Sequence, residues 1–183
     1  MASSSRPVLD RVYLVYFLIH IPVLFCVDLV PLYPSHLWSP PTSPLSFLGD
    51  LRTWYISQYN DQFFAPPPAP IPSFFTLFAF LELVYHLPVS LWAVRALWGS
   101  AGKLGGGVEL ALLVYGFETA LTTATCMYEA ALWDPEVVTL DQKMVLVGGL
   151  YGGYFALAVV MTIDMYSRVL RRVNAADVAK KVQ

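Results

Sequence analysis

The chain alternates between long apolar runs and short connections that are polar or rich in proline or glycine. The apolar runs cover about residues 12–31, 72–98, 106–132 and 143–168. Each is near or above the roughly 20 residues that cross a bilayer as a helix. The pattern predicts an all-α membrane protein, with a four-transmembrane-helix bundle over residues 1–170 and a basic tail over residues 171–183.

The composition agrees with this class. With 57% hydrophobic and 13% charged residues, the chain is too apolar for an ordinary soluble domain. A cleaved secretion signal is a poor alternative for the first run, because it is long, includes Asp28 and lacks a small-residue cleavage site. The net charge of −2 provides no basic face for nucleic acid. No motif has the spacing of a metal or nucleotide site, so we expect no cofactor.

The basic residues predict the orientation, since Lys and Arg are retained on the cytosolic side of a membrane. Of the 11 basic residues, nine lie on the same side as the two termini, and only Arg52 and Lys143 lie on the other side. Both termini are therefore predicted to be cytosolic, and residues 31–71 and 129–141 to form lumenal loops.

The chain carries Lys180 and Lys181 four and three residues from its C-terminus. On the cytosolic side this spacing matches the dilysine retrieval signal, an address that returns proteins to the endoplasmic reticulum. It predicts a multi-pass protein of that membrane. The alternative is a basic tail that acts only as a topology signal.

Carboxylic acids within the apolar runs are the best indication of function. An ionised side chain in hydrocarbon costs at least roughly 2.5–3.5 kcal/mol, so such residues normally face a cavity or a bundle interior. At about 1.5 Å of rise per residue, Glu82 and Glu118 lie near the middle of their spans and Asp28 lies nearer a lumenal end. Glu129 and Asp164 are close enough to span ends to reach water, and we leave them out of the site.

Other polar residues can join these acids in one pocket. Glu82 and His86 are four residues apart and are expected to touch on one helix face. Thr122 follows Glu118 by one turn, and the fourth run supplies the hydroxyl groups of Tyr151 and Tyr154. For each residue alone, the alternative is a local role, such as a pair that joins helices or a threonine bonded to its own backbone.

Two further features have structural explanations. His20 precedes Pro22 by two residues and is expected to satisfy the backbone carbonyls that the proline frees. Cys26 and Cys126 both fall near the lumenal ends of their spans. The sequence leaves open whether they form a disulfide or pack as small apolar residues.

Several of these residues occur in ordered motifs that resemble a known family. The motifs are YFLIHIP at 16–22, Asp28-Leu29, Trp54-Tyr55 with Asp61, and LELVYHLP at 81–88. Together they resemble the sigma-2 receptor group of the EXPERA family over almost the whole chain. The family also holds the emopamil-binding protein, a sterol Δ8–Δ7 isomerase. The resemblance implies a four-helix bundle with both termini cytosolic, a homodimer, a role in sterol homeostasis and a sterol-transport protein as a partner.

The resemblance also implies roles for single residues. It assigns Asp28 as the carboxylate that pairs with a protonated amine, Asp61 as a supporting acid near the pocket mouth, and Glu82 as a residue inside the cavity. His86 and Glu118 depart from the sigma-2 pattern, which has Gln and His at these positions. Glu118-Thr119 instead resembles a Glu-Thr pair in the isomerase.

Two functions follow. In the first, an acidic pocket binds a sterol or a cationic amphiphile, and no bond is made or broken. In the second, Glu82, His86 and Glu118 act as the buried acid and base of a sterol isomerase. The isomerase pattern requires an Asn and a Trp on the fourth span to stabilise a cation, and residues 144–168 contain neither. Binding is therefore favoured over catalysis, and a purely structural membrane protein is the third alternative.

Overall fold

The computed structural model describes residues 8–39, 41–64, 71–100 and 104–182, which form helices and turns and contain no strand. Four helical stretches are long and apolar enough to cross a membrane: Val8–Asp28, Ser73–Gly99, Gly106–Leu132 and Leu140–Lys181. They confirm the all-α class and the number of spans. Arg6 and Lys103, which entered the orientation argument, lie outside the described residues.

Three of the four spans contain a π-helical segment. The first span joins α1 (Val8–Val23) to η1 (Leu24–Asp28), and the second joins α3 (Ser73–Leu81), η4 (Glu82–His86) and α4 (Leu87–Gly99). The third is the uninterrupted α5 (Gly106–Leu132). The fourth joins α6 (Leu140–Lys143), η5 (Met144–Tyr151) and α7 (Gly152–Val182).

Proline explains one of these segments. A proline has no N–H group and therefore leaves the carbonyl four residues earlier without its helical donor. Pro88 lies two residues after η4, and the carbonyl that it frees, that of Val84, is inside η4. The backbone widens there, as helices commonly do at functional sites. Pro22 lies two residues before η1, but the carbonyl that it frees, that of Leu18, is in α1.

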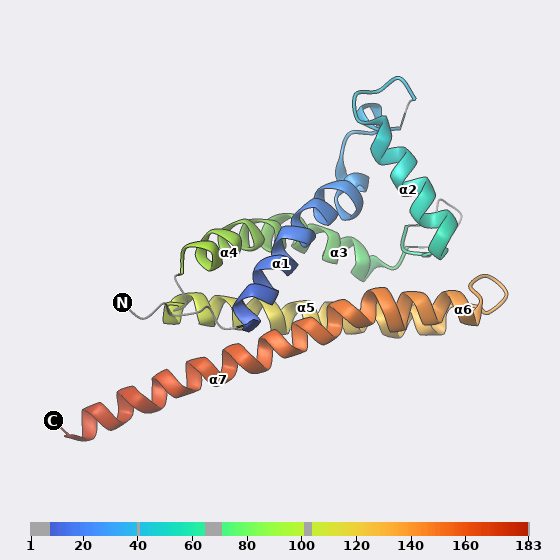
Figure 1. Ribbon diagram of the computed structural model, residues 1–183. Helices are drawn as coiled ribbons and strands as arrows, with labels where there is room; N and C mark the ends of the chain where they lie inside the picture. The colour runs from blue at the N-terminus through green and yellow to red at the C-terminus, as the bar shows by residue number, and fades with distance from the viewer. Residues whose placement is uncertain (1–7, 40, 65–70, 101–103, 183) are drawn as a thin grey trace.

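The helices form a bundle in which α5 and α7 run side by side (Figure 1). Gly116 permits their close approach, because a Cβ atom there would lie 2.9 Å from the Thr162 hydroxyl and 3.1 Å from the Ala158 carbonyl oxygen. α1 packs against α4. Rings and aliphatic side chains of all four spans, including Tyr13, Phe17, Tyr115 and Met165, form the core near the end of the bundle where α1 begins and α7 ends.

The start of α1 and the end of α7 lie at the same end of the bundle, as an even number of spans requires (Figure 1). Which side of the membrane this end faces stays a prediction. The helical backbone continues through residues 171–182, which the sequence analysis treats as a separate tail, and residues 171–181 are all exposed. Lys180 and Lys181 lie near the end of this exposed helical stretch.

The segment 31–71, expected to be loop, contains a helix. After two short 3-10 turns, α2 (Ser46–Tyr59) contacts η1 and ends at Asn60, which has a left-handed φ of 52°. The Asn60 side-chain amide donates to the Val137 carbonyl oxygen at 2.6 Å. This bond ties α2 to the connection between α5 and α6.

A buried ion cluster joins α1 to α7 at the end where the chain enters and leaves the bundle. Asp10 is 1% exposed, and its carboxylate lies 2.7 Å from the Arg168 guanidinium. Arg168 also donates to Asp164 at 2.7 and 3.0 Å, and the Tyr13 hydroxyl donates to Asp164 at 3.1 Å. Because one guanidinium balances two carboxylates, the cluster depends on Arg168.

We expect Arg168→Met to destabilise the protein by about 3–5 kcal/mol, because breaking a buried ion pair leaves charge unpaired in a low-dielectric interior. Thermal unfolding of the purified protein in detergent measures the loss. Arg171→Met is the matched control, since Arg171 is exposed on the same helix. Equal unfolding temperatures for the two variants would contradict the importance of the cluster.

Candidate ligand cavity

A cavity of about 430 Å³ lies among the helices, on the far side of the core from the ion cluster. Its apolar wall includes Val23, Val27, Phe75 and Phe78. Polar and aromatic side chains from every span and from α2 complete the wall; they are His20, Asp28, Trp54, Tyr55, Tyr59, Glu82, His86, Glu118, Thr119, Thr122, Thr123, Tyr151 and Tyr154.

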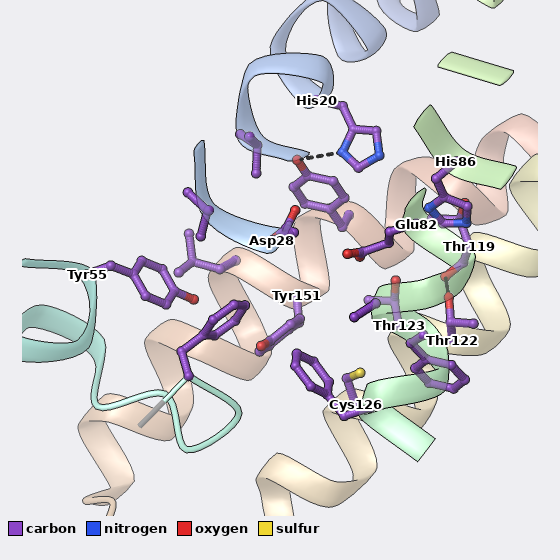
Figure 2. Close-up of a pocket in the computed structure, with 18 of the residues that line it drawn as sticks. His20, Asp28, Tyr55, Glu82, His86, Thr119, Thr122, Thr123, Cys126 and Tyr151 are labelled. Carbon is purple, nitrogen blue, oxygen red and sulfur yellow. Dashed lines mark hydrogen bonds between the residues drawn. The ribbon is translucent and has the colours of Figure 1, made fainter. Parts of the chain in front are cut away.

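The π-helical segments carry the acids into the cavity. Asp28 is the last residue of η1, Glu82 and His86 are the first and last of η4, and Tyr151 ends η5. Figure 2 shows the Asp28 and Glu82 carboxyl groups directed into the cavity from different helices. Both residues are predicted from the sequence, whereas the π-helical backbone around them is not.

His86 contacts Glu118 across the bundle and not Glu82 on its own span. The His86 Nε2 atom and the Glu118 Oε2 atom are hydrogen-bonded to one another. The contact that the four-residue spacing allows between Glu82 and His86 is not made, because the His86 ring pairs with Glu118 on α5 while the Glu82 carboxyl group is directed into the cavity (Figure 2). Glu82 instead faces the cavity independently.

Asp61 is not among the residues that line the cavity, but it lies directly behind two of them. It is fully buried, and its carboxylate accepts hydrogen bonds from the Tyr55 hydroxyl at 2.8 Å, the Tyr151 hydroxyl at 2.7 Å and the Phe63 amide at 3.0 Å. Burial raises the pKa of Asp61, although the bonds from Tyr151 and Tyr55 act in the opposite direction. Asp61 therefore holds two tyrosines that do line the cavity.

The helix α2 supplies a part of the site that sequence reasoning missed. Trp54, Tyr55 and Tyr59 on α2 line the cavity and lie next to η1. The sequence predicts a loop for this segment, in which Trp54-Tyr55 is only part of the family resemblance. The run of aromatic residues between two proline-rich stretches was the available signal.

His20 also belongs to the cavity wall, which corrects its expected role beside Pro22. Its ring stacks on Tyr16, with ring centroids 5.2 Å apart, and its Nδ1 atom lies 3.5 Å from the Tyr154 hydroxyl. This hydrogen bond is the dashed line in Figure 2. Pro22 instead coincides with the change to π-helical backbone.

The remaining candidate residues have simpler positions. Thr122 lines the cavity, but its hydroxyl donates to the Glu118 and Thr119 carbonyl oxygens at 3.0 and 3.2 Å, the local role considered for it. Cys26 and Cys126 are free thiols, which settles the open question of a disulfide.

This fold and cavity define a four-span helical membrane protein with carboxylates and histidines inside its bundle. Residues 47–165 match the family model of EXPERA, the expanded EBP superfamily. The chain belongs to the EXPERA family.

Curated relatives cover most of the chain. It is 29% identical to efficient mitochondria targeting-associated protein 19 of Schizosaccharomyces pombe, over 94% of this chain and 83% of that protein. It is 26% identical to human sigma intracellular receptor 2, over 90% of each chain. The Xenopus tropicalis sigma intracellular receptor 2 is 30% identical over 67% of this chain and 63% of its own length. These matches confirm the resemblance that the motifs indicate.

Proposed function

We propose that the protein binds sterols or cationic amphiphiles in this cavity and takes part in sterol homeostasis, in the manner of a sigma-2 receptor. The volume of about 430 Å³ falls in the range of small-molecule sites, which are mostly apolar with a few placed polar groups. The similarity to sigma intracellular receptor 2 supports the same class of function.

The observation that carries the proposal is the state of Asp28 and Glu82. Within the described part of the chain, neither carboxylate has a hydrogen bond or an ion pair, whereas Glu118 contacts His86 and Asp61 accepts from two tyrosines. A protonated amine donates to such free carboxylates by charge-assisted hydrogen bonds. The apolar wall then covers the body of the ligand.

We expect Asp28→Asn to weaken the binding of amphiphilic amines by about 10- to 150-fold, because a hydrogen bond to a charged group contributes about 1.5–3 kcal/mol. Radioligand binding to the purified protein measures the change. Asp50→Asn is the matched control, since Asp50 is exposed on α2 and lies outside the cavity. Unchanged affinity in Asp28→Asn, in a variant that unfolds at the normal temperature, would refute the assignment.

A sterol Δ8–Δ7 isomerase is the second candidate, and one observation favours it. His86 and Glu118 form a pair on the cavity wall close to Glu82, so a proton donor and a proton acceptor face one space. Against it, the fourth span offers Tyr151 and Tyr154 to the cavity in place of the Asn and Trp that the isomerase pattern requires. Stabilisation of the intermediate cation is therefore weaker, and we favour a function without catalysis.

We expect no growth when the protein is expressed in a yeast strain that lacks sterol Δ8–Δ7 isomerase. A missing stabilising donor costs about 10²–10³ in rate in other enzymes. Immunoblotting establishes expression, and the authentic isomerase is the positive control. Growth that disappears with Glu118→Gln would make the isomerase the better assignment.

We place the protein in the membrane of the endoplasmic reticulum, with its termini in the cytosol. The exposed position of Lys180 and Lys181 on the last turns of α7 leaves them accessible to a coat protein that reads a dilysine signal. A homodimer and a sterol-transport partner are implied by the resemblance alone.

Changing Lys180 and Lys181 to Ser should let the protein move past the endoplasmic reticulum, because the retrieval signal is lost. Fluorescence microscopy of tagged protein, with the tag at the N-terminus, measures the distribution. Changing Arg171 to Ser, which leaves both lysines in place, is the control. If the double variant keeps the localisation of the wild-type protein, the two lysines act only as a topology signal.

A further inference from the structure

A second cavity lies apart from the ligand cavity, between the end of α4 and the start of α5 (Figure 1). It is an open groove of about 540 Å³ at the end of the bundle where α1 begins. Its wall includes the apolar side chains of Trp92, Ala96, Leu104 and Val108, and Leu104 belongs to the core. The charged residue on this wall is Arg95, which is exposed.

The length of the second span places Arg95 at the edge of the membrane. Ser73–Gly99 has 27 residues, which is about 40 Å of helix and close to the thickness of a bilayer with its headgroups. Arg95 comes four residues before the end of this span, about 6 Å at the helical rise. It therefore lies near the boundary between hydrocarbon and headgroups. Trp92, 43% exposed and nearly one turn deeper, is a typical interfacial tryptophan.

Within the described part of the chain, Arg95 has no hydrogen bond or ion pair. Arg168 and Arg172 differ from it, since each is bound to a carboxylate at this end of the bundle. Glu109, the acid in the first turn of α5, is the partner of Arg172 and is not shared with Arg95. The guanidinium group of Arg95 thus faces the headgroup layer without an anion. A lipid phosphate supplies one, because a guanidinium can donate two parallel hydrogen bonds to it.

We propose that the groove between α4 and α5 binds one anionic phospholipid. The lipid phosphate accepts hydrogen bonds from Arg95, and an acyl chain lies along Trp92, Ala96 and Val108. A zwitterionic lipid fits less well, because its ammonium group competes with Arg95 for the phosphate and the described wall offers it no carboxylate. The site shares no lining residue with the ligand cavity, so it is independent of the proposed function.

The experiment measures the binding of phosphatidylglycerol and phosphatidylcholine, with the same acyl chains, to the full-length protein in detergent. Native mass spectrometry gives the affinity for the first bound lipid. The wild-type protein should bind phosphatidylglycerol about fivefold more tightly, the usual contribution of one basic residue to an anionic lipid. Arg95→Gln should remove this preference, and Arg95→Lys should keep most of it.

Arg11→Gln is the matched control. Arg11 is also exposed and without a partner among the described residues, and it lies on α1 near the same end of the bundle, but it does not line the groove. Its substitution should leave the preference unchanged. A second variant tests the apolar part of the groove: Ala96→Leu keeps Arg95 but fills space on the wall, so it should weaken the binding of both lipids severalfold.

Equal affinity of the wild-type protein for the two lipids, or a preference that persists in Arg95→Gln, would overturn the proposal. An equal loss in Arg95→Gln and Arg11→Gln would also overturn it, because the attraction would then come from the basic surface in general. Unchanged binding in Ala96→Leu would show that the chain of the lipid lies elsewhere, which the groove does not allow. Affinity for amphiphilic amines should stay normal in Arg95→Gln, so failure here and failure of the proposed function are distinguishable.

Discussion

Every charged group buried in an apolar bundle must be neutralised by a partner, and this requirement divides the acids of the protein into two sets. Asp10 and Asp164 share Arg168, and Glu109 accepts from Arg172 at 2.5 and 3.1 Å. These pairs hold α1, α5 and α7 together at one end. Asp28 and Glu82, at the cavity, have no such partner among the described residues. Asp61 is buried too, but it accepts hydrogen bonds from two tyrosines. The lack of any such partner at Asp28 and Glu82 is the basis of the basic ligand that we propose.

The change from α-helical to π-helical backbone links the sequence to the site. Pro88 removes the donor for a carbonyl inside Glu82–His86, and this part of the second span is π-helical. Asp28 is the last residue of the π-helical Leu24–Asp28 and Glu82 is the first of Glu82–His86, so both of these cavity acids lie at the limits of widened backbone. The third span, α5, is α-helical throughout and carries Glu118 and Thr119.

Hydropathy alone predicts the number of spans, because about 20 apolar residues must be helical in a membrane. The acids of the cavity could be found for the same reason, since a carboxylate in an apolar run is exceptional. The helix α2 was not predicted, because the proline-rich stretches on either side of it are typical of a loop. The pairing of His86 with Glu118 was missed because the two residues are 32 positions apart on different spans, and a single sequence does not show which faces of two helices meet.

The contact between His86 and Glu118 also gives a physical meaning to two departures from the sigma-2 receptor pattern. The sequence shows these departures on different spans, and the structure brings the two residues into contact. A substitution at one position therefore alters the environment of the other, and the two are best treated together. Since both residues lie on the cavity wall, their contact determines which polar groups this part of the wall contains.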